Sequence, residues 1–594
     1  MLRFLAFVWD PGCESASSQV QQLSQSLTAG EEWADSFLAH GLRVLHTGQD
    51  RQFPEVHRLG DSRGVVLGRV FVRRAPPSAL RVEELIDTAW GRYVAFESDP
   101  DSRAVKIVRS PAGALDCFYA HLGTVQVFFC DVADYVALNA APASINWPWM
   151  ATLLAYPRHA LGAAATGIRG IEQLQPGECF VCMAGGKTSR RLLWNPFQIA
   201  AAQPIDDFAA AAAAIHEATQ LVVSSWAGCY RRIILLLSGG LDSSIVLSCL
   251  RGSQAPPEIH CLTYYSHSCI TGDERFFARL SAERAGVALH EVEEQTAETD
   301  LTQLMRLESN AIPWTYILYV RHSVHEGRFA AATSADAIFS GTAGDQIFFH
   351  GPAVLAAADY LRRRGCFVGF ISYSLNVARR NKLSLWSVLA TAARDRFSTP
   401  RYDSRQDVES PNRLTTRQAF EEADGRPDIR HYWMPFASGV PRGKLLHVMM
   451  TDCPQDLRDP FGAANYPERV HPLNSQPLIE TCLRIPTDVL THAGYSRAAA
   501  RHAFADDLPA AVLSRTSKGY IDSLNAQLLE RNLAWVRELL LDGQLVAHGL
   551  IDRRKLEALL TREQIRLSPA AGEVLCEHLS YEAWLHNWAA TTPS

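Results

Sequence analysis

The chain has 594 residues, more than one hydrophobic core can organise, so we expect at least two domains. Hydrophobic residues make up 47% of the chain and charged residues 20%, which is typical of folded, water-soluble proteins. The formal net charge of −6, from 57 basic and 63 acidic residues, argues against a general binder of nucleic acid or anionic membranes, because such binders need a dominant basic face.

The first nine residues predict a β-strand. Their apolar run is too short for the hydrophobic segment of a secretory signal, and it ends at the turn sequence Asp10-Pro11-Gly12. No other stretch approaches the roughly 20 apolar residues that a membrane helix needs. We therefore expect a cytoplasmic protein without a membrane segment.

The 13 cysteines are scattered and mostly flanked by apolar residues, which favours buried, reduced thiols over disulfides. Cys179 and Cys182 form a Cys-x-x-Cys pair, but no second pair follows, and the flanking residues favour a strand over a metal or redox site. His322 and His325 have helical spacing but lack a third ligand, so a zinc site is not predicted.

Residues 1–200 predict a sheet-rich domain. Short apolar runs alternate there with Gly, Pro and Asp, a pattern typical of successive strands. The clearest runs are residues 64–72, 92–96, 105–108 and 125–130.

Residues 205–594 show a different pattern, in which helices and strands alternate. Ile233 to Leu237 form a continuous apolar run, as expected for a central parallel strand that is buried on both faces. Further strands are predicted at 259–265, 288–292 and 337–340, helices at 205–227, 242–251 and 274–285, a polar loop or insertion at 395–430, and mainly helices after 475. This order predicts a doubly wound α/β domain with a nucleotide site at the carboxyl ends of its strands.

The strongest chemical signal directly follows the strand that ends at Leu237. It is the string Ser238-Gly239-Gly240-Leu241-Asp242-Ser243-Ser244. Two glycines allow a tight turn, and the backbone amides of the helix that begins there attract phosphate oxygens, with the serine hydroxyls as further donors. The string lacks the Gly-Lys-Ser/Thr of a Walker loop. The structural alternative is a strand–helix turn in which Asp and Ser serve as helix caps.

Asp242 distinguishes this loop from other turns that bind phosphate. A carboxylate beside phosphates is repulsive unless a divalent cation lies between them. Asp242 therefore predicts bound Mg²⁺.

The loop matches the pyrophosphate-binding loop of the ATP pyrophosphatase families, and further segments resemble the asparagine synthetase-like synthetases. Residues 340–346, Ser-Gly-Thr-Ala-Gly-Asp-Gln, resemble that family's second motif, which implies that Asp345 is the other magnesium ligand and that Gly341 contacts the nucleotide. The resemblance also implies a nucleotide contact at Leu262 and a catalytic lysine at Lys518. The lysine lies in Arg515-x-x-Lys518-Gly519, and residues 272–275, Gly-Asp-Glu-Arg, resemble the acidic start of the family's next helix. The implied cofactors are ATP and Mg²⁺.

Within this superfamily the chain most resembles the lasso peptide cyclases, also called lasso macrolactam synthetases. The matching residues are 441–444, 471–480, 483–487, 494–497, 501–504 and 508–509, with weaker matches at 90–93 and 109–113. The resemblance implies a degenerate glutaminase-like (Ntn-type) domain at 1–200 and an asparagine synthetase-like ATP pyrophosphatase domain at 205–594.

Three departures from the glutamine-using relatives affect the implied chemistry. Those relatives use a cysteine as the first residue after Met removal, whereas residue 2 here is Leu2 and Cys13 lies inside the chain. The nitrogen nucleophile is then a substrate amine rather than ammonia from glutamine. Thr342 stands where relatives often carry Glu or Tyr, so it is a candidate catalytic residue but the general base is not identified, and Gln346 replaces the usual Glu.

The resemblance implies that an Asp or Glu side chain of a precursor core peptide is adenylated and then attacked by the peptide's own N-terminal amine. The implied partners are a leader-peptide-binding protein and a leader peptidase, with no nucleic acid and no membrane. Three alternatives stay open: a small-molecule ligase of the β-lactam or asparagine type, an inactive nucleotide-binding scaffold, and a tRNA-thiolating or adenylating enzyme. The composition supplies no basic RNA face for the last.

Overall fold

The computed structural model describes most of the chain. The described residues are 2–30, 32–48, 55–59, 63–74, 80–138, 143–183, 185–269, 272–297, 299–307, 310–315, 317–365, 367–397, 413–452, 467–516, 519 and 522–591. Of the predicted site residues, Lys518 lies outside them.

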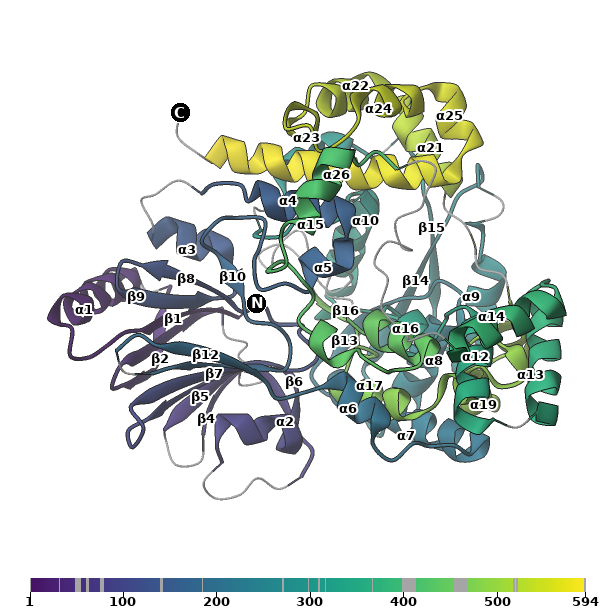
Figure 1. The fold of residues 1–594 in the computed structure, drawn as a ribbon, viewed down its shortest axis with the longest axis horizontal. Helices are drawn as coiled ribbons and strands as arrows, with labels where there is room; N and C mark the ends of the chain where they lie inside the picture. The colour runs from purple at the N-terminus through teal and green to yellow at the C-terminus, as the bar shows by residue number, and fades with distance from the viewer. Residues whose placement is uncertain are drawn as a thin grey trace.

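The N-terminal region contains two six-stranded sheets whose assigned strand pairs are antiparallel (Figure 1). One has the order β10-β8-β9-β1-β3-β2 and the other β12-β11-β7-β6-β5-β4. Their bounds are β1 Arg3–Val8, β2 Ala34–Ala39, β3 Leu42–Thr47, β4 Val56–Arg58, β5 Gly64–Val72, β6 Ala89–Asp99, β7 Ala104–Arg109, β8 Phe118–Leu122, β9 Val125–Phe129, β10 Glu172–Gln173, β11 Glu178–Cys182 and β12 Thr188–Leu192.

The period of two along β1 explains how this region is layered. Phe4 and Ala6 belong to a core shared with the facing sheet, while Leu5 and Phe7 belong to a second core that includes Ala16 of α1 (Glu14–Ala29). A strand with apolar residues on both faces must be covered on both sides. The region is therefore helix, sheet and sheet in succession, and the predicted sheet-rich fold is confirmed.

The C-terminal region is built on a five-stranded parallel sheet of order β15-β14-β13-β16-β17. Its strands are β13 Arg232–Leu236, β14 Glu258–Tyr265, β15 Leu289–Glu293, β16 Ala337–Ser340 and β17 Glu468–Val470. The connecting helices include α7 Phe208–Ala227, α8 Leu241–Arg251, α9 Arg275–Ala285 and α10 Ile317–Thr333. The predicted doubly wound parallel α/β fold is confirmed, and β17 is a strand that the sequence did not predict.

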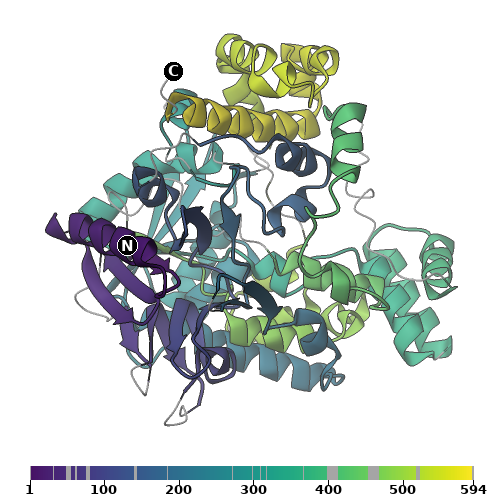
Figure 2. The same ribbon diagram turned by 60° about the vertical axis from the view of Figure 1, so that its left-hand side comes forward.

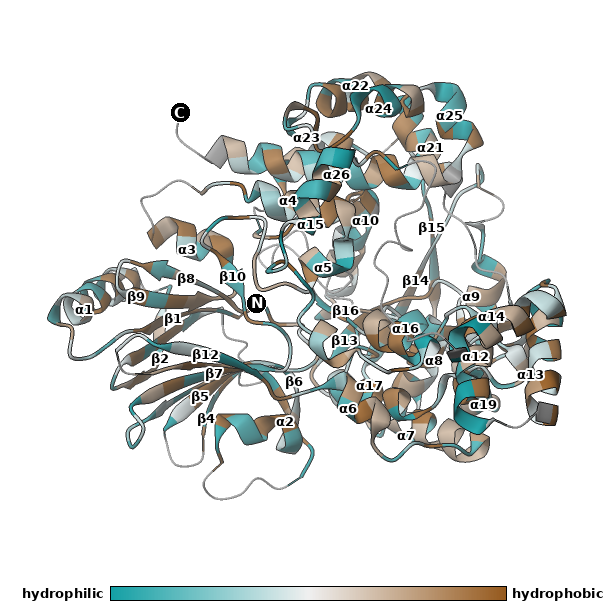
Figure 3. Cartoon of the chain, viewed as in Figure 1, coloured by the Kyte–Doolittle hydropathy of each residue, from teal (hydrophilic) through white to brown (hydrophobic). Residues whose placement is uncertain are grey.

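Both faces of the parallel sheet are covered, as the continuous apolar run predicts. Ile233 and Leu235 of β13 share a core with Ile245 of α8, whereas Ile234 packs with Ala330 of α10 on the opposite face. Figure 3 shows brown, hydrophobic segments along α7 and α17 (Gln476–Arg484), two helices that contact each other. Among the described residues, no helix is long and apolar enough to span a membrane.

The residues after 475 are mainly helical, as predicted, and they also contact the N-terminal half of the chain. The long helix α26 (Pro569–Thr591) shares a core with α4 (Trp147–Ala155), and the yellow C-terminal helices lie over the dark blue segment in Figure 2. The prediction of a loop at 395–430 is wrong for α15 (Arg417–Asp424), a short amphipathic helix that packs on α4. Residues 398–412 of that stretch lie outside the described residues.

A buried ion cluster joins the two regions. Arg69 of β5 lies 3.2 Å from Glu468 at the start of β17, and Arg92 of β6 also pairs with Glu468. Glu55 lies 3.5 Å from Arg69. Burial raises the pKa of Glu468, but the two arginines outweigh burial and lower it overall, so the carboxylate stays ionised between them.

The paired cysteines and His322 lie in packed surroundings. Cys179 and Cys182 lie buried in β11, and burial raises the pKa of each thiol to about 12, so both are neutral. The eleven described cysteines are all free. His322 stacks on Tyr264 with ring centroids 3.9 Å apart and lies 2.8 Å from Glu294, which places it in an ion-pair cluster.

Candidate active site

The predicted phosphate loop connects β13 to α8, where a tight turn is required. Gly239 has φ +73°, and a Cβ there would lie 2.7 Å from the carbonyl oxygen of Glu274. Only glycine fits this position without strain or collision. Gly240 is the N-cap of α8, and the amides of the first helical turn have no acceptor within the helix. The loop therefore presents several N–H donors at the carboxyl end of a central strand.

The other residues of the loop divide between lining and support. Ser238 and Ser243 have hydroxyl oxygens 3.2 Å apart at the turn. Ser244 is buried instead, and its hydroxyl contacts the carbonyl of Gly240 at 2.8 Å and the hydroxyl of Ser281 at 2.9 Å. Leu241 packs into the core. Ser244 and Leu241 thus hold the turn in place through their side chains.

Leu262 of β14 also lies in the interior. Its side chain is 1% exposed and belongs to the core that contains Ile234, and its carbonyl accepts a hydrogen bond from the amide of Leu237 at 2.8 Å. The structure therefore buries the side chain of this predicted nucleotide contact in the core.

The second predicted motif lies against the first because β16 pairs with β13 in parallel. A Cβ on Gly341 would lie 2.5 Å from the amide nitrogen of Ser243, and one on Gly344 would lie 2.5 Å from the Cγ of Asp242. The two loops therefore touch at these glycines. This contact brings Asp242 and Asp345, at the start of α11 (Gly344–Ile347), to one edge of the sheet.

Arg497 joins the two predicted metal ligands. Its Nη1 donates to Asp242 Oδ2 at 2.7 Å and to Asp345 Oδ1 at 2.5 Å. Arg497 is the N-cap of α19 (Ala498–Ala503) and has left-handed backbone angles, φ 55° and ψ 34°. Such angles are uncommon for a residue with a side chain and concentrate at functional sites. Arg497 lies in the lasso-like segment 494–497, but no role was predicted for it.

The two carboxylates fit a magnesium ion. Both accept a hydrogen bond from one nitrogen of the Arg497 guanidinium, and both come from loops at the carboxyl ends of adjacent strands. Mg²⁺ in nucleotide sites is commonly held by one or two carboxylates together with substrate phosphates. No cluster of three or more His, Cys, Asp or Glu that could hold a metal occurs within the described ranges. A donor set of two carboxylates suits a metal that arrives with phosphates.

Thr342 is held by a chain of hydrogen bonds that begins at His471, the residue after β17. The hydroxyl of Ser340 donates to Thr342 Oγ1 at 2.8 Å, and Ser340 Oγ lies 2.8 Å from His471 Nδ1. Burial, with a smaller contribution from Arg469, lowers the pKa of His471 to about 3, so the ring is neutral. Neutral groups alone therefore orient the hydroxyl of Thr342.

The segment that precedes and follows Lys518 is fixed to the loop through Glu274. Glu274 accepts hydrogen bonds from the guanidinium of Arg515 and from the amide of Gly519, the latter at 2.7 Å. Arg515 also donates to the carbonyl of Gly239 at 3.2 Å. Arg501, one turn after Arg497, donates to the carbonyl of Arg515 at 2.8 Å. The described residues on both sides of Lys518 therefore contact the predicted nucleotide loop or its neighbour.

Helix α11 is supported from behind by a buried polar chain. Lys444 donates to the carbonyls of Leu483 and Ile485 at 3.0 and 2.6 Å and lies 3.0 Å from His447 Nδ1. His447 Nε2 lies 2.9 Å from the carbonyl of Ile347, the last residue of α11. Burial lowers the pKa of Lys444 to about 7. The chain links α11 to the lasso-like segments at 441–444 and 483–487.

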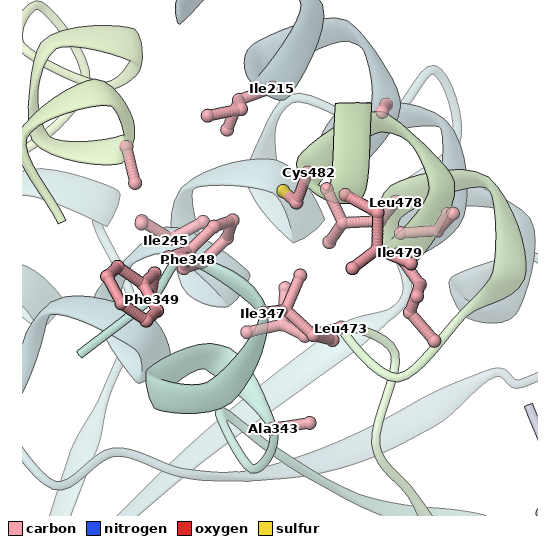
Figure 4. Close-up of a cluster of buried hydrophobic side chains, with 14 of the residues drawn as sticks. Ile215, Ile245, Ala343, Ile347, Phe348, Phe349, Leu473, Leu478, Ile479 and Cys482 are labelled. Atoms are coloured by element: carbon pink, nitrogen blue, oxygen red, sulfur yellow. The ribbon is translucent and has the colours of Figure 1, made fainter. Parts of the chain in front are cut away.

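Apolar residues complete this support. Figure 4 shows Ile347 beside Leu473 and Ile479 in a buried cluster, with Phe348 and Phe349 at the end of the short helix. Each of the five is at most 2% exposed. The helix that carries Asp345 therefore rests on a packed core, which fixes the position of the carboxylate.

The family comparison agrees with this geometry. The model of the asparagine synthase family, described as "Asparagine synthase", matches residues 229–586, which is more than half of the chain and includes both carboxylates. The chain belongs to the asparagine synthase family. Residues 229–586 are thus an asparagine synthase-like, ATP-dependent amide-forming domain of a family that uses ATP and Mg²⁺.

Other comparisons add little to this assignment. No curated protein matches the chain. Two similar solved structures are titled as the allosteric regulatory enzyme of purine biosynthesis and as glutamine phosphoribosylpyrophosphate amidotransferase from B. subtilis complexed with ADP and GMP. Both share 9% identity with this chain, with TM-scores of 0.18 and 0.20. They cover 49% and 58% of this chain, and 74% and 91% of their own chains, and at such TM-scores they carry no argument.

Proposed function

We propose that this asparagine synthase family member closes a macrolactam in a lasso peptide precursor at the expense of ATP. The observation that carries the proposal is the convergence of Asp242 and Asp345 on one cationic atom beside a glycine turn that opens a helix. The family match supports ATP-dependent formation of a carbon–nitrogen bond. The peptide substrate is inferred from the lasso-like segments.

Nucleotide binding follows from the loop. The amides at the start of α8 and the hydroxyls of Ser238 and Ser243 would donate to phosphate oxygens. Asp242 and Asp345 would hold Mg²⁺, which supplies positive charge that stabilises the leaving pyrophosphate. Arg515 brings a further positive charge to the same turn through its bond to Gly239.

The reaction then has two steps. An Asp or Glu carboxylate of the core peptide attacks the α-phosphorus of ATP, which forms an acyl-adenylate and releases pyrophosphate. The N-terminal amine of the same peptide attacks the activated carbonyl, the amide bond forms, AMP leaves, and the amine loses its proton. Lys518 would stabilise the negative charge on the tetrahedral intermediate. Thr342, oriented by Ser340, would accept a hydrogen bond from the amine.

The lasso-like segments gather around the site, which favours a peptide substrate over a small molecule. His471 contacts Ser340, Arg497 contacts both carboxylates, and Arg501 contacts the segment before Lys518. These residues lie far apart in sequence from the loops that they touch. Because the enzyme must hold a folded peptide while its ring closes, much of the rate would come from proximity of the amine and the activated carbonyl.

Mass spectrometry of a candidate precursor tests the proposal. The precursor is incubated with its leader-binding protein, leader peptidase, ATP, Mg²⁺ and the full-length protein, with Asp242→Ala as the inactive variant. Asp336→Asn is a matched control, because Asp336 caps the amides of Arg231 and Arg232 at the opposite end of the same sheet. We expect a core peptide lighter by one water and the release of one AMP for each ring closed. Both products should be lost in Asp242→Ala and kept in Asp336→Asn.

Two other outcomes would contradict parts of the proposal. Release of AMP without a dehydrated peptide would keep the ligase chemistry and exclude this substrate. Absence of both with a verified precursor would favour a nucleotide-binding scaffold.

A further inference from the structure

Arg497 occupies the place that the proposed metal needs. Its Nη1 lies 2.7 Å from Asp242 Oδ2 and 2.5 Å from Asp345 Oδ1, and Mg²⁺ binds carboxylate oxygens at about 2.0–2.1 Å. A metal ion and this nitrogen cannot lie between the same two oxygens at once. We propose that Arg497 is an internal counter-ion that excludes free divalent cations from Asp242 and Asp345, so that the metal binds together with the nucleotide.

The charges explain why the nucleotide is needed. Asp242 and Asp345 together carry two negative charges. Arg497 and a divalent cation together carry three positive charges, so the site would hold one excess positive charge. Excess positive charge in a site whose side chains are only 10 to 27% exposed is costly. A triphosphate brings anionic oxygens that compensate both cations. The proposal rests on the proposed function only for the metal site itself.

The backbone around Arg497 is suited to a change of position. Ala493, Gly494 and Arg497 all have positive φ, at 52°, 74° and 55°. For Ala493 and Arg497 this region is disfavoured and persists only where surrounding contacts hold it. One such contact is the pair of hydrogen bonds that Arg497 Nη1 donates to the two carboxylates. Loss of these hydrogen bonds would therefore also relieve backbone strain.

A second arginine holds the same segment without touching the carboxylates. Arg380 donates to the carbonyl of Ala493 at 2.9 Å and lies 3.1 Å from the centroid of the Tyr495 ring. Ser496 is fixed separately, with its hydroxyl 2.8 Å from His350 Nδ1. Replacement of Arg380 would loosen the segment and leave the counter-ion in place, which makes it a matched control.

Mn²⁺ binding measured by electron paramagnetic resonance tests the inference on the full-length protein. Wild type, Arg497→Met and Arg380→Met are titrated with Mn²⁺, with and without α,β-methylene-ATP. Without nucleotide, we expect Arg497→Met to bind one Mn²⁺ about tenfold or more tightly than wild type, and Arg380→Met to bind like wild type. With the analogue, wild type should gain a tightly bound Mn²⁺.

The remaining outcomes are decisive as well. A folded Arg497→Met with the nucleotide-free affinity of wild type overturns the inference while leaving the proposed function intact. The inference is also overturned if Arg380→Met tightens Mn²⁺ equally, because loosening alone would then be the cause. If Arg497→Met does not fold, the neutral variant Arg497→Gln decides, and absence of any tightening in that variant overturns the inference. A wild type that binds no Mn²⁺ with or without nucleotide overturns both the inference and the proposed metal site.

Discussion

The double sheet of the N-terminal region and the parallel sheet of the synthase domain each hold a buried arginine, and the two are satisfied in different ways. Arg109, at the end of β7, is 0% exposed and donates to the carbonyls of Gly113, Leu115 and Leu174. It also pairs with Asp116 at 2.9 Å. Arg497 instead donates to two carboxylates, those of Asp242 and Asp345, through the single nitrogen Nη1.

The difference separates a structural charge from a functional one. Three backbone carbonyls around Arg109 join loops that would otherwise have unsatisfied groups, so this arginine holds one conformation together. Arg497 instead contacts the negatively charged carboxylates of Asp242 and Asp345, and its own backbone angles are left-handed. Replacement of Arg109 should therefore lower the stability of the fold, whereas replacement of Arg497 should change the chemistry of the site.

The largest effect is expected from Asp345→Asn. The substitution keeps the size of the side chain but removes the charge that would hold Mg²⁺ beside the phosphates, so we expect AMP formation to fall by about a thousandfold or more. Asp336→Asn at the opposite end of the sheet should leave the rate unchanged. Quantification of AMP by chromatography checks both, and an active Asp345→Asn would contradict the assigned metal ligand.

Asp242 was predicted from a local pattern, a continuous apolar run that ends one residue beyond β13 and is followed by a glycine turn. Asp345 was predicted from the resemblance of residues 340–346 to the family's second motif, and the pairing of β16 with β13 brings the two loops to one edge of the sheet. The contact of Arg497 with Asp242 spans 255 residues, and no local pattern encodes such a separation. β17 is only three residues long and starts with Glu468, so neither length nor alternation marked it as a strand.

The next effect is on stability and concerns Arg109→Met. Removal of the guanidinium leaves three carbonyls without this donor and takes the ion-pair partner from Asp116, so we expect a loss of about 3–5 kcal/mol in the free energy of unfolding. Arg43→Met is the control, because Arg43 pairs with the exposed Asp35 and should cost at most about 1 kcal/mol. Urea titration followed by fluorescence measures both, and equal losses would erase the distinction.

A further prediction concerns acid stability in the synthase domain. Burial raises the pKa of Glu294, but hydrogen bonds and charges from His322 and Arg321 outweigh it, and the pKa falls from 4.5 to about 2. The unfolded chain binds this proton first as pH falls, so the stability that Glu294 contributes is complete above about pH 4.5 and is lost between pH 4.5 and 2. The contribution is about 3 kcal/mol at most.

Glu294→Gln should flatten that part of the pH profile. We would measure the free energy of unfolding from about pH 6 to about pH 3. As the pH falls, the free energy of unfolding of the variant should decrease less steeply than that of wild type. Glu32→Gln is a suitable control because Glu32 pairs with Arg3 at the surface. Parallel profiles for wild type and Glu294→Gln would show that the ion pair with Arg321 does not set the acid limit.

The smallest effect is expected at Thr342, where the neutral His471 and Ser340 direct a hydroxyl instead of a charge. Thr342→Val keeps the branched shape and removes one hydrogen bond, so we expect about a tenfold loss in the rate of ring closure. Exchange of pyrophosphate into ATP, which reports acyl-adenylate formation alone, should stay near the wild-type rate. Ser340→Ala should show the same split to a smaller degree, because it removes only the group that orients the hydroxyl. If Thr342→Val slowed both steps equally, Thr342 would act on the nucleotide rather than on the amine. The hydrogen-bond chain from His471 through Ser340 would then support the nucleotide and metal site.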